Sequence, residues 1–125
     1  MTVPDPRHAL TEPALIIYAA PDRHPGGEPV PHYISLIKWT DEGLRNVRES
    51  PKRADAAEQL AKQTGGKTQL FYTMGEYDLV ALTEAPNDEA AMQILLQLGS
   101  MGNVRTTTMK AWTPADAAKI VAKLK

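Results

Sequence analysis

Asp78 is the side chain in this sequence best suited to act as a general base. It begins an apolar run in which Val80 and Leu82 share its face of an extended strand, and a carboxylate there is costly unless it is paired. Tyr77 precedes it, and Arg105 supplies a cation from a later segment. If Asp78 accepts a proton while Tyr77 or Arg105 polarises an oxygen, these residues support an acid–base reaction without a cofactor.

A second set of residues is suited to hold an anion. Lys52 and Arg53 follow a proline at the start of a predicted helix, where cationic side chains add to the positive end of the helix dipole. With Lys38 and Arg105 they would form an anion site, because arginine offers a bidentate fork to carboxylates and phosphates. The structural alternative is that Asp78 pairs with these cations and holds the helix against the sheet.

Four aromatic residues on predicted strands are candidates for a ligand pocket: Trp39, Tyr72, Tyr77 and Trp112. They would line a pocket between sheet and helix or between subunits, where ligand sites often occur. The alternative is that they are core or dimer contacts. Trp39 and Tyr72 therefore join the four basic residues as candidate ligand-binding residues.

Metal and cofactor chemistry is not predicted. There is no cysteine, and the three histidines, His8, His24 and His32, lack metal-ligand spacing. No glycine-rich segment matches a nucleotide-binding loop, because Gly99 and Gly102 are placed as helix terminators. We therefore expect no cofactor, and the enzyme class stays open, with a non-enzymatic role favoured.

Composition narrows the remaining classes. A length of 125 residues is that of one domain, and a net charge of −1 gives no basic footprint for nucleic acid. No apolar run approaches the ~20 residues of a membrane span, and no segment resembles a signal peptide. These observations predict a cytoplasmic protein. Residues 1–31 hold seven of the ten prolines and no periodicity, which predicts a flexible extension before a domain at residues 32–125.

The elements that must position these residues are organised around a hairpin. Gly75 lies between apolar runs at residues 68–74 and 77–83, and a two-residue turn with glycine would pair Tyr72 with Leu79 and Leu70 with Ala81. Both hairpin faces are largely apolar, so we expect both to be covered.

Strands and helices alternate along the rest of the domain. Strands are predicted at residues 33–39 and 104–112, and helices after the caps Thr40, Asn87 and Thr113. The first helical region is interrupted by Pro51, with Ser50 as a new cap and a Gly65-Gly66 end. Apolar positions with helical spacing are Leu44, Val47, Ala54, Ala57, Leu60 and Ala61 in this region, Ala91, Ile94, Leu95 and Leu98 in the second, and Ala117, Ile120, Val121 and Leu124 in the terminal helix.

The resulting order, β-α-β-β-α-β plus a helix, predicts an α+β fold of the ferredoxin-like class with an antiparallel sheet. Two helices cover one face of such a sheet, and the chain has no spare element beyond the terminal helix for the other. A homodimer in which sheets pack face to face is the economical solution.

Four blocks in order resemble the GYD domain family of small bacterial and archaeal proteins: Trp39-Thr40, residues 50–53, residues 74–78 and residues 99–108. Glu76 stands between the glycine and the Tyr-Asp pair for which the family is named. The resemblance covers about residues 32–125 and implies a dimeric α/β-barrel-like assembly without an established activity.

Three functional hypotheses remain open. The favoured one is a homo-oligomeric module that binds a small anionic or aromatic metabolite. The second is a cofactor-independent enzyme of the isomerase or monooxygenase type, as found on dimeric α/β barrels; this rests on fold analogy alone. The third is an oligomerisation unit without a ligand.

Overall fold

The computed structural model describes residues 30–125. The extension predicted for residues 1–31 lies outside this range except for its last two residues, and it stays a prediction. The elements in chain order are β1 (His32–Trp39), α2 (Asp41–Arg45), η2 (Val47–Glu49), α3 (Ser50–Gln63), β2 (Lys67–Tyr72), β3 (Leu79–Glu84), α4 (Asp88–Ser100), β4 (Val104–Ala111) and α5 (Pro114–Val121).

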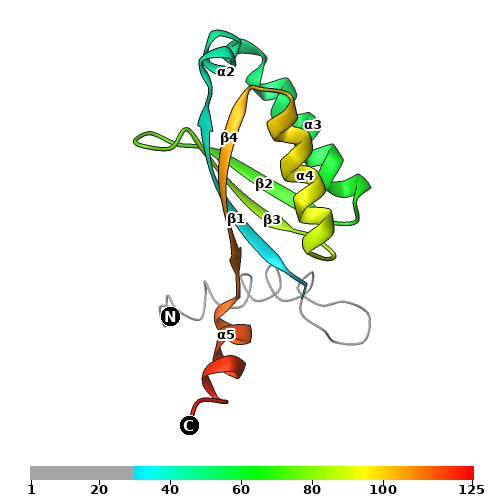
Figure 1. The fold of residues 1–125 in the computed structure, drawn as a ribbon, viewed down its shortest axis with the longest axis vertical. Helices are drawn as coiled ribbons and strands as arrows, with labels where there is room; N and C mark the ends of the chain where they lie inside the picture. The colour runs from blue at the N-terminus through cyan, green and yellow to red at the C-terminus, as the bar shows by residue number, and fades with distance from the viewer. Residues whose placement is uncertain (1–29) are drawn as a thin grey trace, which may run out of the picture. The chain divides into compact units, whose positions relative to one another are not determined.

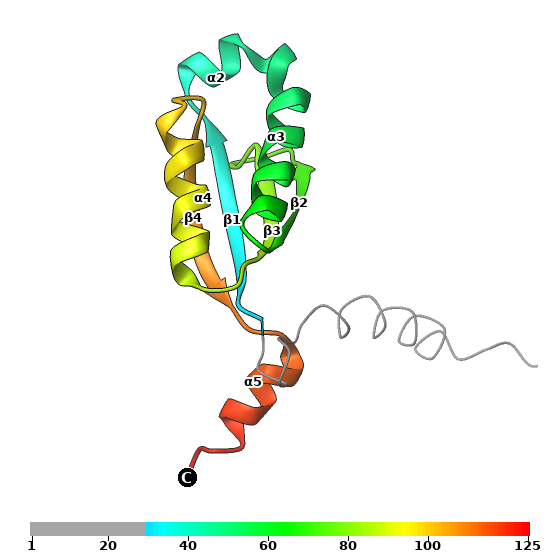
Figure 2. The same cartoon turned by 90° about the vertical axis from the view of Figure 1, so that its right-hand side faces the viewer.

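The four strands form one antiparallel sheet in the order β2-β3-β1-β4. This is the ferredoxin-like α+β arrangement that the sequence predicts. Helices α3 and α4 lie on the same side of the sheet (Figures 1 and 2). We call that side the covered face and the opposite side the open face. None of the described helices is long and apolar enough to cross a membrane.

The register of the central hairpin is the predicted one: Tyr72 pairs with Leu79 and Leu70 with Ala81. Both strands are shorter than the predicted runs, because the ladder ends on the turn side at the pair Tyr72 and Leu79. Beyond it, the Thr73 N–H donates to the Asp78 carbonyl at 2.9 Å, so the pairing continues into the turn. Gly75 has a φ of 114°, a value that favours glycine.

The interrupted first helix is confirmed as α2, the short 3₁₀ segment η2, and α3. Thr40 accepts a hydrogen bond from the Gly43 N–H, as expected of a cap. The predicted cap at Ser50 is wrong, because α3 already includes Ser50 and its hydroxyl faces Tyr72 instead. Leu44 is 57% exposed, so the short α2 contributes less to the core than its spacing predicts.

Helix α3 ends in the glycine cap that the sequence predicts. Gly65 has a φ of 88°, its N–H donates to the Lys62 carbonyl, and the Gly66 N–H donates to the Ala61 carbonyl. This is the Schellman arrangement. A Cβ on Gly66 would lie 2.0 Å from the Glu84 carbonyl oxygen, so only glycine lets the chain pass so close to the end of β3.

The core lies between the covered face and the two helices. Ile37, Leu79 and Ala81 form one buried cluster, and Tyr33, Ala85 and Ala91 form another. The apolar stripe predicted for α4 faces this space, since Ile94 is buried and Leu95 and Leu98 line the cavity beneath them. Several small residues on α3 also face the sheet, and they leave room that larger side chains would fill.

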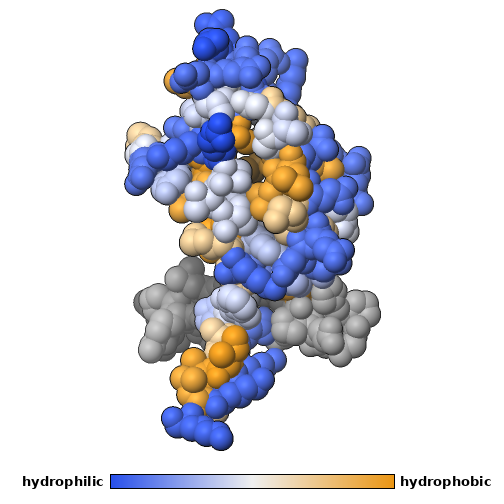
Figure 3. All heavy atoms as spheres, viewed as in Figure 1, coloured by the Kyte–Doolittle hydropathy of each residue, from blue (hydrophilic) through white to orange (hydrophobic). Residues whose placement is uncertain are grey.

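The open face is not covered by any described element. Its apolar side chains alternate with those of the covered face; Phe71, Leu82 and Met109 are 46%, 41% and 45% exposed. Helix α5 does not cover it either, because it extends away from the end of the sheet (Figures 1 and 2). The apolar residues of α5 form an exposed patch (Figure 3), and Ile120 and Val121 are 49% and 61% exposed.

Candidate functional site

An apolar cavity of about 110 Å³ lies between the covered face and the first half of α3. We call it the Trp39 cavity. Its apolar walls come from all four strands and from α3 and α4, and they include Ile37, Trp39, Leu60, Leu70, Leu79, Leu98, Met101 and Val104. Three polar residues, Ser50, Arg53 and Asn103, also line it. An apolar pocket with a few convergent polar groups is the usual form of a small-molecule site.

The first polar group at this cavity is a pair of hydroxyls. Ser50 is 5% exposed, and its Oγ lies 2.8 Å from the Tyr72 hydroxyl. Either oxygen is able to donate in this bond, so the hydrogen of the accepting hydroxyl stays available to a third group. The Tyr72 ring also lies beside Trp39, with ring centroids 6.4 Å apart. Tyr72 therefore links the serine to the aromatic wall.

Arg53 is the cation of the Trp39 cavity. Its guanidinium donates to the Asn46 carbonyl at 2.9 Å and to the Gly43 carbonyl at 3.4 Å. These bonds fix the side chain across the interruption between α2 and α3, while its other N–H groups stay available. A Cβ on Gly43 would lie 1.9 Å from the Asn103 carbonyl oxygen, so the backbone packs closely behind the arginine. The positive charge is thus held in place beside an apolar space.

Asp78 has a structural partner in the backbone. The Trp39 N–H donates to its Oδ2 at 2.9 Å, and the Asp78 N–H donates to the Ile37 carbonyl at 2.9 Å. The two bonds secure the turn against the end of β1. Within the part of the chain that the structure describes, Asp78 makes no ion pair with a basic side chain. The sequence-based alternative that it pairs with the cations is therefore wrong.

The predicted ligand-binding residues fall into separate groups. Trp39 and Arg53 line the Trp39 cavity, and Tyr72 lies beside it, in contact with the lining residues Trp39 and Ser50. Lys38 lies opposite Arg105 on the neighbouring strand, and both point to the open face. Lys52 is largely exposed, and its Nζ lies 3.6 Å from the Glu49 Oε2. The structure thus brings three of the six residues together and does not assemble the four predicted cations into one anion site.

Tyr77, the second catalytic candidate, lies in the turn. Its ring is 5.2 Å from the Lys38 Nζ, and the Thr73 hydroxyl donates to its carbonyl oxygen at 2.7 Å. Lys38 also lies 3.8 Å from Glu76. The fourth aromatic candidate, Trp112, follows β4 and is 55% exposed. Neither Tyr77 nor Trp112 lines the Trp39 cavity.

Two features beside the covered face do not follow from local sequence signals. For Ser50 the sequence predicts only a capping role, because serine before proline is a common helix start. The other feature is a cluster in which the Tyr33 hydroxyl donates to Asp88 and the Lys110 Nζ lies 2.9 Å from the same carboxylate. No local signal joins these residues, since Tyr33 and Asp88 are brought together only by the packing of α4 on β1.

The contacts within this cluster shift the pKa values of Tyr33 and Asp88. Burial, together with the hydrogen bond to Asp88, raises the pKa of the Tyr33 hydroxyl. The hydrogen bonds from Tyr33 and Lys110 lower the pKa of the Asp88 carboxyl. Tyr33 is therefore a neutral donor at physiological pH, and Asp88 is an ionised acceptor. Among residues 30–125, no group of three or more acidic or histidine side chains is arranged to hold a metal ion.

Comparisons with known proteins identify the family of the chain. Residues 33–121 match the GYD domain family. A protein of Thermus thermophilus, named glutamine synthetase and cystathionine beta-lyase binding protein, is 31% identical over 98 residues, which cover 77% of this chain and all of that protein. A crystal structure from the same organism matches at 22% identity with a TM-score of 0.43, covering 66% of this chain and 94% of the other. On the family match and the first of these relatives, the chain belongs to the GYD domain family.

Proposed function

We propose that this protein is a cytoplasmic, homo-oligomeric binding module that takes a small molecule with an apolar ring and an anionic group. The observation that carries the proposal is the Trp39 cavity, an apolar space of about 110 Å³ beside a fixed guanidinium. An engineered apolar cavity of roughly 150 Å³ takes up benzene, so this space suits a body of about one ring. A larger ligand would extend from its mouth.

The preference for an anion is supported by the polar groups of the cavity. Arg53 is held by two backbone carbonyls, so a ligand would not have to order it. The Ser50–Tyr72 pair offers a further O–H donor at the same wall. A carboxylate would therefore find one cation and one hydroxyl, while the ring contacts Trp39.

Assembly as a homodimer is supported by the open face. Phe71, Leu82 and Met109 are large apolar side chains on the same surface, and no described element covers them. A second copy packed against this surface would remove it from water, with a gain of roughly 25 cal/mol per Å² of apolar area before the costs of association. The two copies would keep their Trp39 cavities on the outer sides of the dimer.

Thermal unfolding with benzoate as the probe tests ligand binding. A binder is stabilised by mass action, by ~2.7 kcal/mol at a hundredfold excess over Kd. Ala54 lines the cavity, so Ala54→Phe should fill it and abolish the stabilisation. Ala118→Leu on the exposed face of α5 is the matched control and should leave it unchanged. Equal stabilisation of wild type and Ala54→Phe would show that benzoate binds elsewhere.

A second candidate function is binding to another protein. The Thermus relative is named for binding glutamine synthetase and cystathionine beta-lyase. Exposed apolar side chains on α5 support a protein contact here as well. Sedimentation of the chain mixed with glutamine synthetase from its own host tests this function: a joint boundary that Val121→Asp removes supports it, and independent sedimentation contradicts it.

A further inference from the structure

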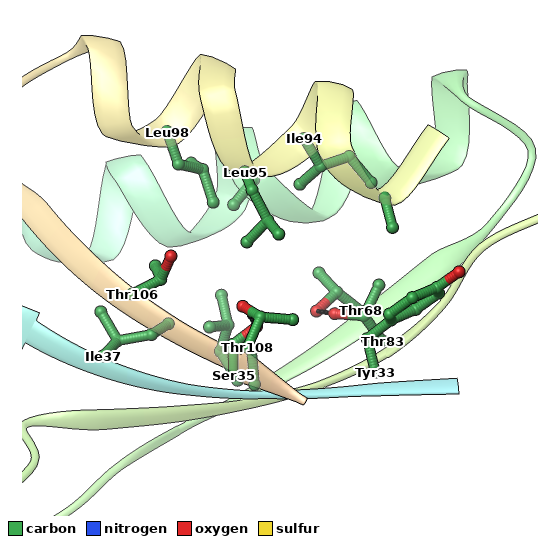
Figure 4. Close-up of a pocket in the computed structure, with 14 residues that line it drawn as sticks. Tyr33, Ser35, Ile37, Thr68, Thr83, Ile94, Leu95, Leu98, Thr106 and Thr108 are labelled. Carbon is green, nitrogen blue, oxygen red and sulfur yellow. Dashed lines mark hydrogen bonds between the residues drawn. The ribbon is translucent and has the colours of Figure 1, made fainter. Parts of the chain in front are cut away.

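A second, smaller cavity of about 30 Å³ adjoins the Trp39 cavity beneath α4 (Figure 4). The two spaces share four wall residues, Ile37, Ala57, Leu70 and Leu98. In Figure 4 the side chains of α4 form the roof, and the covered face of the sheet forms the floor. A molecule bound in the Trp39 cavity would therefore have its far end next to this second space.

The floor of the second cavity is rich in hydroxyls, and we call it the hydroxyl chamber. Its hydroxyl residues are Ser35, Thr68, Thr83, Thr106 and Thr108, together with Tyr33. These side chains lie on the face of the sheet that packs against α3 and α4, where an ordinary core carries apolar side chains. Burying a hydroxyl without a partner costs free energy, so such a concentration requires an explanation.

Four of the hydroxyls satisfy each other in pairs. Ser35 and Thr108 lie 2.8 Å apart, and Thr68 and Thr83 lie 2.7 Å apart, oxygen to oxygen. Thr106 differs, because its hydroxyl has no hydrogen bond to any residue in the described part of the chain. Its oxygen is directed into the space below α4 (Figure 4). The cavity of about 30 Å³ beside it leaves room for one small polar group of a ligand.

Strand register sets the spacing between the chamber and the Trp39 cavity. Trp39 lies opposite Val104, and two residues along the same strands Ile37 lies opposite Thr106. Two residues of a strand span roughly 6.6–6.8 Å, about the length of a six-membered ring with substituents at opposite ends. A ring that lies along the strands, with its acid group at the end of the Trp39 cavity lined by Trp39 and Arg53, would therefore place its opposite substituent beside Thr106.

We propose that Thr106 determines ligand specificity: the site selects small aromatic acids that carry a hydrogen-bonding group, such as a hydroxyl, opposite the carboxylate. This inference rests on the proposed function and adds the ligand class to it. The ligand hydroxyl bonds to the Thr106 hydroxyl. An analogue with a methyl group in its place would leave the threonine hydroxyl without a partner.

Isothermal titration with three probes tests the proposal: benzoate, 4-hydroxybenzoate and 4-methylbenzoate. The hydroxyl and methyl probes have nearly the same size, so their ratio of affinities isolates the hydrogen bond. We expect the wild type to bind 4-hydroxybenzoate about tenfold more tightly than 4-methylbenzoate. Thr106→Val should abolish or reverse that ratio, whereas Thr106→Ser, which keeps a hydroxyl, should retain part of it.

Thr107→Val is the matched control, because Thr107 is the neighbouring threonine on the opposite face and is exposed. It should leave the ratio unchanged, and circular dichroism should show all three variants folded. If the wild type binds the probes without discrimination, or if Thr106→Val leaves the ratio intact, the specificity proposal is overturned while the proposed function stands. If none of the three probes binds, both fail together.

Discussion

Each face of the sheet carries some side chains that are usually found on the other: hydroxyls lie among the apolar residues of the covered face, and large apolar side chains lie on the open face. The covered face, which packs against two helices, carries Ser35, Thr106 and Thr108 around a cavity. The open face, which no described element covers, carries Phe71 and Leu82. A solitary domain would gain stability from the opposite arrangement. These two features support the proposed ligand site beneath the helices and the proposed contact between two copies on the open face.

A charge on the open face would break this comparison most strongly. Leu82→Asp would bury an unpaired carboxylate in a face-to-face dimer, at a cost of about 3–4 kcal/mol, or a roughly 100- to 1000-fold rise in the dimer dissociation constant. Light scattering over a concentration series measures this dissociation constant. Met92→Asp, an exposed apolar position on the outer side of α4, should leave the dimer intact. A wild type that stays monomeric at micromolar concentration contradicts the dimer.

The close packing behind the Trp39 cavity gives the next largest effect. Gly43→Ala would place a Cβ 1.9 Å from the Asn103 carbonyl oxygen, and we expect the free energy of unfolding to fall by about 1–3 kcal/mol. Gly99→Ala meets nothing within 4 Å and lies inside α4, so it should raise stability by roughly 0.5–1 kcal/mol. Urea denaturation compares the pair; equal effects would mean that the α2 contact is loose.

Substitutions of Asp78 distinguish a structural role of its carboxylate from a catalytic one. Asp78→Ala removes the acceptor of the Trp39 N–H and should cost about 1–2 kcal/mol of unfolding free energy. Asp78→Asn keeps an acceptor oxygen and should cost less. If Asp78→Asn instead keeps full stability but abolishes a turnover measured for the wild type, the enzyme hypothesis is correct and the carboxylate acts as a base.

The Tyr33–Asp88–Lys110 cluster gives the smallest effect, and its contribution to stability changes only at extremes of pH. The folded pKa of Asp88 is lowered, so its contribution is complete above its unfolded value of about 3.9 and is lost as pH falls through the folded pKa. The folded pKa of Tyr33 is raised, so its contribution is complete below about pH 10 and is lost as pH rises through the folded value. In urea denaturation across pH, the stability difference between wild type and Tyr33→Phe should be constant between about pH 5 and 9 and narrow below about pH 4. A difference that widens in acid would contradict this assignment.

Local signals predicted the elements and their order well. The caps at Thr40, Asn87 and Thr113 accept the expected N–H groups, and the hairpin register follows from turn length. These features depend on residues a few positions apart, which is why a single sequence reveals them. The family resemblance is confirmed by the match to residues 33–121.

The site could be predicted only in part. Trp39, Arg53 and Tyr72 do lie close together, because aromatic and basic residues flank the helix interruption that the proline imposes. The hydroxyl chamber was overlooked, because the threonine run of β4 is equally explained by strand propensity. Deciding which threonine faces the helices needs the register of β4 on β1, and that pairing is set by tertiary packing.

The central position of β1 has a consequence for how the chain acquires its structure. Tyr33 pairs with Thr83 and with Lys110, which lie 50 and 77 positions later. During synthesis β1 therefore waits for about half of the domain before β3 exists and for most of it before β4 exists. Such distant pairings slow folding. We therefore expect β2 and β3 to pair first, and the pairing of β1 with β3 and β4 to form last.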